Sequence, residues 1–300
     1  MIVYSNNKIN RAAHLRNKSD KFLKAEVIPI WKENVFLSKD DPSAPAIRLN
    51  RNISDDFPMY FLGVEGNVEI WCQDLSFLSI YHACEYVKAS TTLPLLDSEP
   101  VWIRKAYKVL GNYDSGLVAL GIGVSNWNRN NRNCGTCGGL TKMADKGYLR
   151  ICKNCEKKIY PQFESIVVFL LEHIDKNGIK SCLLQQTPVK NGLLVSCLSG
   201  FVEIGETLED AVKREAREET GLEIKDVRYI ESQPWPFPSG LMTGFSALAT
   251  DKNFTLDRSE VPDAAWYTQS ELTQGISNGR IKVSRGDSIA RRMIYKWLEK

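Results

Sequence analysis

Three glutamates in the second half of the chain are spaced so that they could bind a metal ion. Glu215, Glu218 and Glu219 stand at positions i, i+3 and i+4, which puts all three carboxylates on one face of a helix. Carboxylates this close repel one another unless a cation lies among them, and their oxygens suit Mg²⁺ or Mn²⁺, ions that also bind substrate phosphates. Glu206 precedes the helix and is expected to reach the same ions. We therefore predict a catalytic metal site here.

The chain around these glutamates follows a recognisable spacing. It reads GFVEIGETLEDAVKREAREETGL from Gly200 to Leu222, and Gly200 and Gly205 bracket the loop as a backbone bent around a site requires. The order of its glycines, its Arg-Glu pair and its Glu-Glu pair resembles the Nudix box, the signature of hydrolases that cut nucleoside diphosphates linked to another group. Arg214 falls on a different helical face and is expected to orient a carboxylate. The alternative is an acidic, solvated helix face.

Four of the eight cysteines form a second candidate metal site. They occur as CGTC, with Cys134 and Cys137, and as CKNC, with Cys152 and Cys155. Two such pairs at this separation fit the tetrahedral Zn²⁺ site of a zinc ribbon. Because four thiolates fill the coordination sphere, the zinc is predicted to be structural. Disulfides or a redox dithiol are the alternatives, and they suit a cytosolic chain poorly.

Composition and charge limit the classes of partner. The 300 residues carry a formal net charge of +3, which is too small to indicate a general nucleic-acid or membrane binder. Arg129, Arg132 and Lys153 lie near the cysteines, where a nucleic-acid contact is one interpretation and a solvated rim is the commoner one. The longest apolar run, 166–171, is too short to span a bilayer, and the start of the chain has no signal-peptide pattern. A cytoplasmic protein without membrane contact is therefore expected.

The apolar pattern from about residue 165 onward predicts a mixed α/β domain. A hairpin is expected where Asn177 and Gly178 separate two apolar runs. Thr207 is expected to cap the helix that carries the glutamates, with its apolar residues facing the core and its glutamates facing outward. An amphipathic helix is expected over 288–300. Strands are predicted over 166–171, 181–185, 193–198, 227–231, 242–249 and 264–268. In the first part of the chain, the pattern predicts a strand over 68–73 and helices over 103–110 and 116–127.

A segment of alternating prolines and aromatic residues follows the glutamates. It reads SQPWPFPS from Ser232 to Ser239, and its prolines favour an extended, stiff backbone. Such a backbone can hold Trp235 and Phe237 as flat surfaces for a ligand ring. A packed proline-rich loop is the commoner meaning of such a segment by itself.

The cysteine pairs, Tyr160-Pro161, the stretch 200–222 and this segment together resemble the NADH pyrophosphatase (NudC-type) branch of the Nudix superfamily. The resemblance is dense from about residue 127 onward and faint before it. It implies an α/β (α+β) fold, with a Nudix α/β/α sandwich and a mixed sheet. The implied domains are a diverged Nudix-like α/β domain over 1–126, a four-cysteine zinc ribbon over 127–162 and a catalytic Nudix hydrolase domain over 163–300.

The resemblance also implies a set of ligands for the catalytic ions. Glu215, Glu218 and Glu219 look like the metal-binding glutamates of the family, and Glu260 matches a further one. The main-chain carbonyl before the first glycine of the box, which falls on Ser199, is implied as another ligand.

Substrate contacts are implied in the same way. Tyr160 and Phe201 resemble the residues that lie on the two sides of the nicotinamide ring, and Ala290 and Arg104 match weaker contacts. The segment that lines the dinucleotide is expected to comprise Gln233, Pro234, Trp235, Pro236, Phe237, Pro238 and Ser239.

The implied activity is hydrolysis of NADH or NAD⁺ to NMN(H) and AMP with Mg²⁺ or Mn²⁺, and it extends to removal of NAD caps from RNA. The resemblance also implies a homodimer. Two alternatives stay open at this point: a Nudix hydrolase for another dinucleotide or ADP-ribose, and a zinc-ribbon RNA-binding protein with an inactive Nudix domain.

Overall fold

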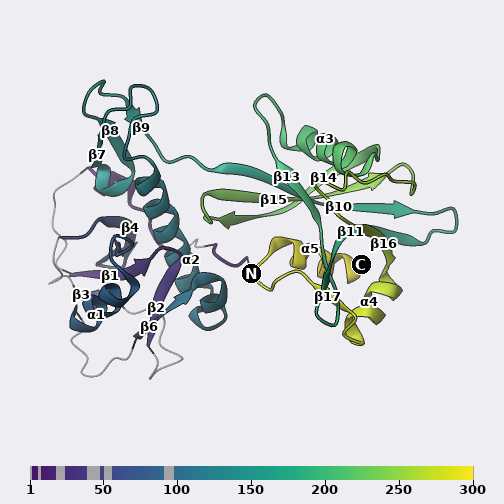
Figure 1. Ribbon diagram of the computed structural model, residues 1–300, viewed down its shortest axis with the longest axis horizontal. Coiled ribbons are helices and arrows are strands. Elements are labelled where there is room, and N and C mark those ends of the chain that lie inside the picture. The colour runs from purple at the N-terminus through teal and green to yellow at the C-terminus, as the bar shows by residue number, and fades with distance from the viewer. Residues whose placement is uncertain are drawn as a thin grey trace. The chain divides into compact units, whose positions relative to one another are not determined.

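A computed structural model describes residues 2–5, 8–17, 24–38, 48–50, 56–90 and 98–299. The contacts divide the chain into two compact units (Figure 1). Unit 1 comprises Met1–Phe163 and Pro234–Ser239, and unit 2 comprises Glu164–Gln233 and Gly240–Lys300. The division into three domains stays a prediction, and parts of the expected first domain lie outside the described residues.

Unit 2 is built on a mixed sheet of eight strands. Their bounds are β10 Glu164–Ile174, β11 Lys180–Val189, β12 Gly192–Ser196, β13 Leu198–Phe201, β14 Ile224–Trp235, β15 Gly240–Ala249, β16 Ala264–Thr268 and β17 Ile281–Val283. Six of them lie in the order β14-β15-β10-β11-β12-β17, while β13 also pairs with β10 and β16 with β11. The sheet is mixed because β10 runs parallel to β15 but antiparallel to β11 and β13.

Helices cover both faces of this sheet (Figure 1). They are α3 (Leu208–Thr220) on one face, and α4 (Gln269–Ser277) and α5 (Ile289–Leu298) on the other. One core contains Val167, Phe169 and Leu171 of β10 with Ala211 and Ala216 of α3. The other contains Val168 and Leu170 of β10 with Leu272 of α4 and Met293 of α5. Because side chains alternate along a strand, β10 is apolar on both faces, and the expected α/β/α sandwich is confirmed.

Two loop predictions in unit 2 had different outcomes. The hairpin at Asn177 and Gly178 is confirmed, since β10 and β11 pair antiparallel and Gly178 has a φ of 79°. The single strand expected over 193–198 is wrong. β12 pairs with β11 and β13 pairs with β10, so the chain changes neighbour at Cys197, a break that its continuous apolar sequence does not reveal.

Unit 1 contains a second α/β core. Its sheet has the order β4-β5-β1-β2-β6, with β3 paired to β1. The bounds are β1 Lys24–Trp31, β2 Asn34–Ser38, β3 Leu49–Asn50, β4 Met59–Glu65, β5 Val68–Asp74 and β6 Ser98–Trp102, preceded by the short 3-10 helix η1 Ala13–Leu15. Val27 of β1 packs with Val87 of α1 (Ile80–Ser90). Ile28 and Ile30 pack instead with the second helix, α2 (Ile103–Asn130).

Helix α2 (Ile103–Asn130) joins the two helices that the sequence predicts. Its helical backbone is interrupted at Gly111, where φ is 64° and ψ is 174°, so the expected break is present but is one residue wide. The helix also continues past residue 126, the expected end of the first domain. Within the described part of the chain, no helix is both long and apolar enough to cross a membrane.

A small sheet of three strands completes unit 1. It consists of β7 (Thr141–Ala144), β8 (Leu149–Cys152) and β9 (Lys158–Ile159), with the short 3-10 helix η2 (Asp145–Gly147) between the first two. The first cysteine pair precedes β7 and the second begins at the end of β8. The hairpin therefore sets the distance between the two pairs.

Candidate metal and substrate site

Helix α3 begins and ends where its sequence specifies, but two of its glutamates are buried against the sheet, where they were expected to face outward. Thr207 Oγ1 accepts a hydrogen bond from the Asp210 N–H at 3.1 Å, which confirms the predicted cap. Glu215 and Glu219 are only 7% and 5% exposed, so the expectation that the glutamates face outward is wrong for these two. They continue the stripe of buried residues at helical spacing, whereas Glu218 is exposed.

Three carboxylates converge at the buried side of this helix. Oxygens of Glu215, Glu219 and Glu260 all lie within 4.8 Å of one another. Glu260 comes from the loop before β16, where its N–H donates to the carbonyl of Asp257 at 3.2 Å. The structure therefore brings together two of the helix glutamates and the additional glutamate that the family resemblance implied.

Gly200 makes room for one of these carboxylates. A Cβ atom at this position would lie 1.9 Å from Cδ of Glu215 and 2.0 Å from its Oε1, far inside any contact distance. Gly200 lies in β13, so it permits a close approach and does not bend a loop, which corrects the role expected for it. Gly205, with a φ of 96°, is the glycine that the turn requires.

Arg214 supplies the positive charge among the carboxylates. Its guanidinium donates to both oxygens of Glu206, at 2.7 and 3.1 Å, to Oε1 of Glu215 at 2.9 Å and to Oε2 of Glu218 at 2.8 Å. It also donates to the carbonyl of Phe201 at 2.8 Å. The bonds agree with an orienting role. They also show that Arg214 shares the site, because its long side chain reaches back to the face that carries the glutamates.

The protonation of the site follows from this arrangement. Burial, together with the neighbouring carboxylates of Glu215 and Glu260, raises the pKa of Glu219 to about 8. Burial also raises the pKa of Glu215, although Arg214 acts against this shift. Hydrogen bonds from Arg214 lower the pKa of Glu206. Without a further cation, the site therefore holds one carboxyl group that is mostly protonated at neutral pH.

Glu219 also shows that the residues present fit a metal ion. Its Oε2 atom is buried and has no hydrogen-bond partner among the residues that the structure describes. A buried oxygen without a partner is costly, and converging carboxylates are the usual ligands of hard divalent cations. The donor set fits Mg²⁺ or Mn²⁺.

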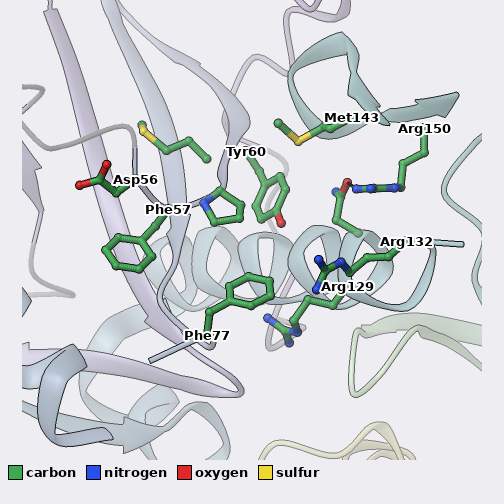
Figure 2. A pocket seen from close by; sticks show the side chains of 11 residues that line it. Asp56, Phe57, Tyr60, Phe77, Arg129, Arg132, Met143 and Arg150 are labelled. Carbon is green, nitrogen blue, oxygen red and sulfur yellow. Dashed lines mark hydrogen bonds between the residues drawn. The ribbon is translucent and has the colours of Figure 1, made fainter. Parts of the chain in front are cut away.

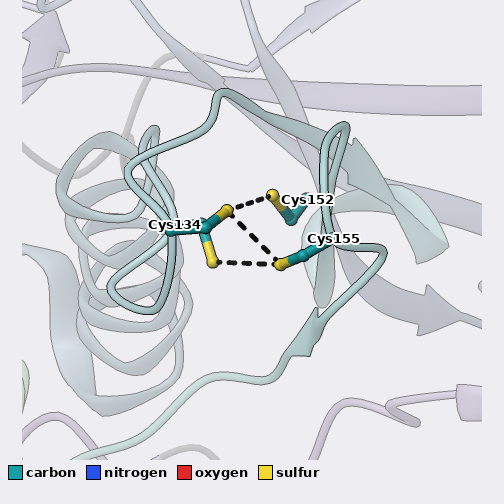
Figure 3. Close-up of side chains that lie close together, drawn as sticks. Cys134, Cys152 and Cys155 are labelled. Carbon is teal, nitrogen blue, oxygen red and sulfur yellow. Dashed lines mark hydrogen bonds between the residues drawn. The ribbon is translucent and has the colours of Figure 1, made fainter.

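The four predicted zinc ligands converge in unit 1 (Figure 3). Sγ of Cys137 lies 3.5 Å from that of Cys152 and 3.4 Å from that of Cys155, and Cys134 Sγ lies 3.8 Å from Cys155 Sγ. A tetrahedral ion with bonds of about 2.3 Å separates its sulfurs by about 3.8 Å, whereas a disulfide needs about 2.05 Å. All four thiols are free. The N–H groups of Thr136 and Cys137 lower the pKa of Cys134, and those of Cys155 and Asn154 lower the pKa of Cys152, which favours the thiolate at these two positions. A hydrogen bond from the N–H of Gly139 is outweighed by the neighbouring thiols of Cys155 and Cys152, which raise the pKa of Cys137.

Two of the expected substrate contacts are exposed aromatic residues. Phe201, at the end of β13, is 58% exposed, and Tyr160, just after β9, is 56% exposed. Their rings are accessible for stacking on a ligand. Ser199 lies in the same strand as Phe201 and pairs with Val168 of β10.

Gln233 and Ala290 are buried in unit 2, where they meet the start of α5. The side chain of Gln233 donates to the carbonyl of Asp287 and accepts from the N–H of Ile289, both at 2.7 Å. The N–H of Ala290 donates to Ser288 Oγ at 3.2 Å. These bonds satisfy groups at the helix N-terminus, so the Gln233 amide has a structural task that the sequence did not predict.

The rings of Trp235 and Phe237 pack inside unit 1. Their centroids lie 5.4 Å apart, and they meet the ring of Tyr4 at 6.0 and 5.2 Å, all edge to face. The guanidinium of Arg104 lies 4.4 Å from the centroid of Trp235. Pro236 packs against Gly123 of α2, where a Cβ atom would lie 2.9 Å from it. These contacts correspond to a packed proline-rich loop, and a contact of this segment with a dinucleotide stays a prediction.

Comparison with known proteins identifies the family. The NUDIX domain family matches residues 165–286. The NAD-capped RNA hydrolase NudC of Mycobacterium bovis is 32% identical over 247 residues, which cover 79% of this chain and 74% of that protein. The chain belongs to the NudC-type branch of the Nudix superfamily. A NudC protein of Citrobacter koseri is 34% identical over 187 residues, or 59% of this chain and 71% of that protein.

A longer relative matches only in part. The human NAD-capped RNA hydrolase NUDT12 is 35% identical over 196 residues, which cover 62% of this chain. The match spans 42% of the human protein, so the chain corresponds to less than half of that relative.

Two features of this site were not predicted from the sequence. The bonds of Arg214 to three glutamates were not predicted, because neighbouring residues such as Arg214 and Glu215 do not share a helical face. The closeness of Gly200 to Glu215 depends on how α3 packs on β13. A signal was nevertheless present, since a glycine inside a strand often marks close approach of another group.

Proposed function

We propose that this chain hydrolyses the pyrophosphate of NADH or NAD⁺ to NMN(H) and AMP with Mg²⁺ or Mn²⁺, and that it removes NAD caps from RNA by the same reaction. One observation carries the proposal: Glu215, Glu219 and Glu260 converge in a NUDIX domain around a buried oxygen that lacks a partner among the described residues. The NAD-capped RNA hydrolases among the relatives support the choice of substrate.

Glu215, Glu219 and Glu260 would hold the catalytic ions, and the exposed Glu218 would complete the set. Ions of this kind neutralise phosphate charge and lower the pKa of a bound water. Glu219 must give up its proton before it can bind a cation, since its pKa is about 8. The proposed catalytic role of Glu215, Glu218 and Glu219 is therefore to hold the positively charged ions beside the substrate phosphates. Either Glu218 or Glu219 would also accept a proton from the attacking water.

Arg214 affects how the two remaining predicted metal ligands, Glu206 and the Ser199 carbonyl, would bind an ion. Because both oxygens of Glu206 accept from Arg214, Glu206 would reach an ion only if that pair opens. The bond from Arg214 to the Phe201 carbonyl ties the helix to the end of β13. The same strand carries Ser199, whose carbonyl is the further proposed ligand.

Selection among Nudix substrates must lie at the two ends of the molecule, since all of them present phosphates to the ions. Phe201 and Tyr160 are proposed to stack on the nicotinamide ring, which their exposure permits. Ala290 and Arg104 are proposed as weaker contacts. The proposed lining of the dinucleotide comprises Gln233, Pro234, Trp235, Pro236, Phe237, Pro238 and Ser239.

The proposal also includes a structural ion, an assembly and a location. Cys134, Cys137, Cys152 and Cys155 would bind Zn²⁺, which leaves no open position for chemistry. The family resemblance supports a homodimer, the commonest closed assembly. The proposed cytoplasmic location rests on the sequence, whose longest apolar run is too short to span a bilayer. Light scattering on the intact protein tests the dimer.

Product analysis tests the reaction. The purified chain should convert NADH, NAD⁺ and NAD-capped RNA with Mn²⁺, and should convert ADP-ribose or diadenosine polyphosphates more slowly. Glu219→Gln keeps the size of the side chain but removes the charge, so turnover should fall by orders of magnitude. Glu223→Gln is the matched control, because the Glu223 carboxylate is exposed and bonds only to Arg217 among the described residues. Near wild-type turnover of Glu219→Gln would overturn the proposal.

A further inference from the structure

Unit 1 contains a pocket of about 500 Å³ that the proposed reaction does not use (Figure 2). This volume lies in the range of ligand sites. The pocket is lined from the start of β4, the turn after β5, the end of α2 and the β7–β8 hairpin. The lining side chains on which the inference depends are Tyr60, Phe77, Arg129, Arg132 and Arg150.

Positive charge gathers at one end of this pocket. Figure 2 shows the side chains of Arg129, Arg132 and Arg150 together, with Asp56, the one acid among the described lining residues, at the opposite end. Arg129 is paired with the buried carboxylate of Asp74. Arg132 and Arg150, by contrast, form no ion pair with any residue in the described ranges. Two guanidinium charges are therefore left for an anion.

Arg150 is held in place by the protein and still faces the pocket. It donates to Asn128 Oδ1 at 3.1 Å and to Thr141 Oγ1 at 2.7 Å. Asn128 is itself buried, and its amide donates to the carbonyls of Val124 and Gly147 at 3.0 and 2.9 Å. A guanidinium fixed in this way loses little entropy when a ligand binds.

Tyr60 adds a hydrogen-bond donor to the lining of the pocket. Its side chain is 2% exposed, and its hydroxyl points into the pocket in Figure 2. Within the described part of the chain, this hydroxyl has no hydrogen-bond partner. Burial raises the pKa of Tyr60, so the hydroxyl stays a donor. The hydroxyl is therefore available to donate a hydrogen bond to a ligand in the pocket.

Aromatic rings beside the guanidinium groups narrow the class of ligand. Phe77 is 50% exposed, and the guanidinium of Arg132 lies 5.7 Å from its ring centroid. A second pocket of about 560 Å³ shares Arg129 and adds Lys32 and Trp102, together with the acidic Glu33. An acidic peptide would use the charges but would leave the rings uncovered. Phosphates joined to flat bases would use both.

We propose that this pocket binds single-stranded RNA, with a phosphate on Arg132, Arg150 and Tyr60 and a base on Phe77. The choice of RNA rests on the proposed function, because NAD-capped RNA carries such a chain. Binding itself requires neither hydrolysis nor a cap.

Anisotropy of a labelled, uncapped RNA of ten nucleotides tests the proposal at several salt concentrations. Phe77→Ala should weaken binding by about 5- to 150-fold and leave the salt dependence unchanged. Arg132→Ala should weaken binding and lower the slope of log K against log salt by about 0.7. Lys142→Ala is the matched control for charge. Lys142 neighbours the lining residue Met143 in β7 and is exposed, and alternation puts it on the other face.

Turnover of NADH separates this inference from the proposed function. All three variants should hydrolyse NADH like the wild type, because none changes a residue of the glutamate site. RNA binding that depends on Arg132 and Phe77, in a protein that hydrolyses no dinucleotide, would support the pocket and remove the reaction. Equal RNA affinity in Phe77→Ala, Arg132→Ala and Lys142→Ala, with normal NADH turnover, would refute the pocket as an RNA site.

Discussion

The close approach of Gly200 to Glu215 can be tested by adding one methyl group. In Gly200→Ala the new Cβ would lie 1.9 Å from Cδ of Glu215, whereas carbon atoms in contact stay about 3.5–4.0 Å apart. The carboxylate must therefore move by more than about 1 Å. The end of a flexible side chain can do this without a shift of the backbone, so we expect Gly200→Ala to fold and to lose the position of one metal ligand.

The size of the effect follows from what Glu215 touches. Displacement would break its 2.9 Å bond from Arg214 and remove it from the cluster with Glu219 and Glu260. Forcing an extra methyl group into a packed site costs about 1–3 kcal/mol. Misplacing a group that orients a metal site lowers affinity or activity by about 10- to 100-fold. We therefore expect Gly200→Ala to lower the free energy of unfolding by about 1–3 kcal/mol and the Mn²⁺ affinity by about 10- to 100-fold.

A double-mutant cycle assigns the cause. Chemical denaturation and Mn²⁺ titration would be measured for Gly200→Ala, Glu215→Ala and the double variant. Once the Glu215 carboxylate is gone, Gly200→Ala should cost almost nothing or should stabilise by about 0.4–1 kcal/mol, since alanine restricts the unfolded chain. The coupling between the two sites should therefore exceed about 1 kcal/mol. Equal costs in both backgrounds, or unchanged Mn²⁺ affinity in Gly200→Ala, would refute the reasoning.

Three further predictions concern zinc, nicotinamide and pH. Cys134→Ser should release zinc and lower the melting temperature, because a four-thiolate site contributes folding energy; a folded, active and zinc-free variant would contradict this. Phe201→Ala should reduce kcat/KM for NADH by about 5- to 150-fold and barely change it for ADP-ribose, since only the former has a nicotinamide; equal losses would mean that the ring only packs the loop. Hydrogen bonds from Arg292 and Lys296 outweigh burial and lower the pKa of Glu231 in the folded protein. The ionised Glu231 therefore stabilises the fold fully above its unfolded pKa of about 4.3, and this contribution is lost as the pH falls through the lower pKa of the folded state. Glu231→Gln should thus cost about 1–2 kcal/mol at pH 7 and nothing near pH 2 by urea denaturation, and a loss that is independent of pH would contradict the assignment.

Local patterns in the sequence were sufficient for features that depend on neighbouring residues. The cap at Thr207, the hairpin at Gly178 and the cysteine pairs each rely on contacts over a few positions, and all three sites have the expected local geometry. Helix α3, which carries the glutamates, shows the limit. Its acidic residues were expected to face water, but Glu215 and Glu219 extend the apolar stripe and are buried. Charge alone predicts exposure, and only the packing of α3 against β13 reverses it.

Features assembled from distant segments could not be predicted in this way. The pocket in unit 1 draws Tyr60 from β4, Phe77 from a turn, and Arg132 and Arg150 from either side of the first cysteine pair. None of these residues forms a motif with its sequence neighbours. Arg132 carried a signal as a basic residue near the cysteines, yet the ring that lies beside it is more than fifty positions earlier in the chain.

The charge balance of the glutamate site explains why Arg214 belongs to it. Two buried carboxylates on one helix would repel each other during folding, before any ion is bound. Arg214 bonds to Glu215, and the raised pKa of Glu219 keeps a proton on that group, so the site can fold with less net charge than its sequence suggests. The arginine does not replace a divalent ion, because Oε2 of Glu219 still has no partner in the part of the chain that the structure describes. The same groups that let the helix pack therefore present a donor set of the charge and ligand type that a divalent ion would require.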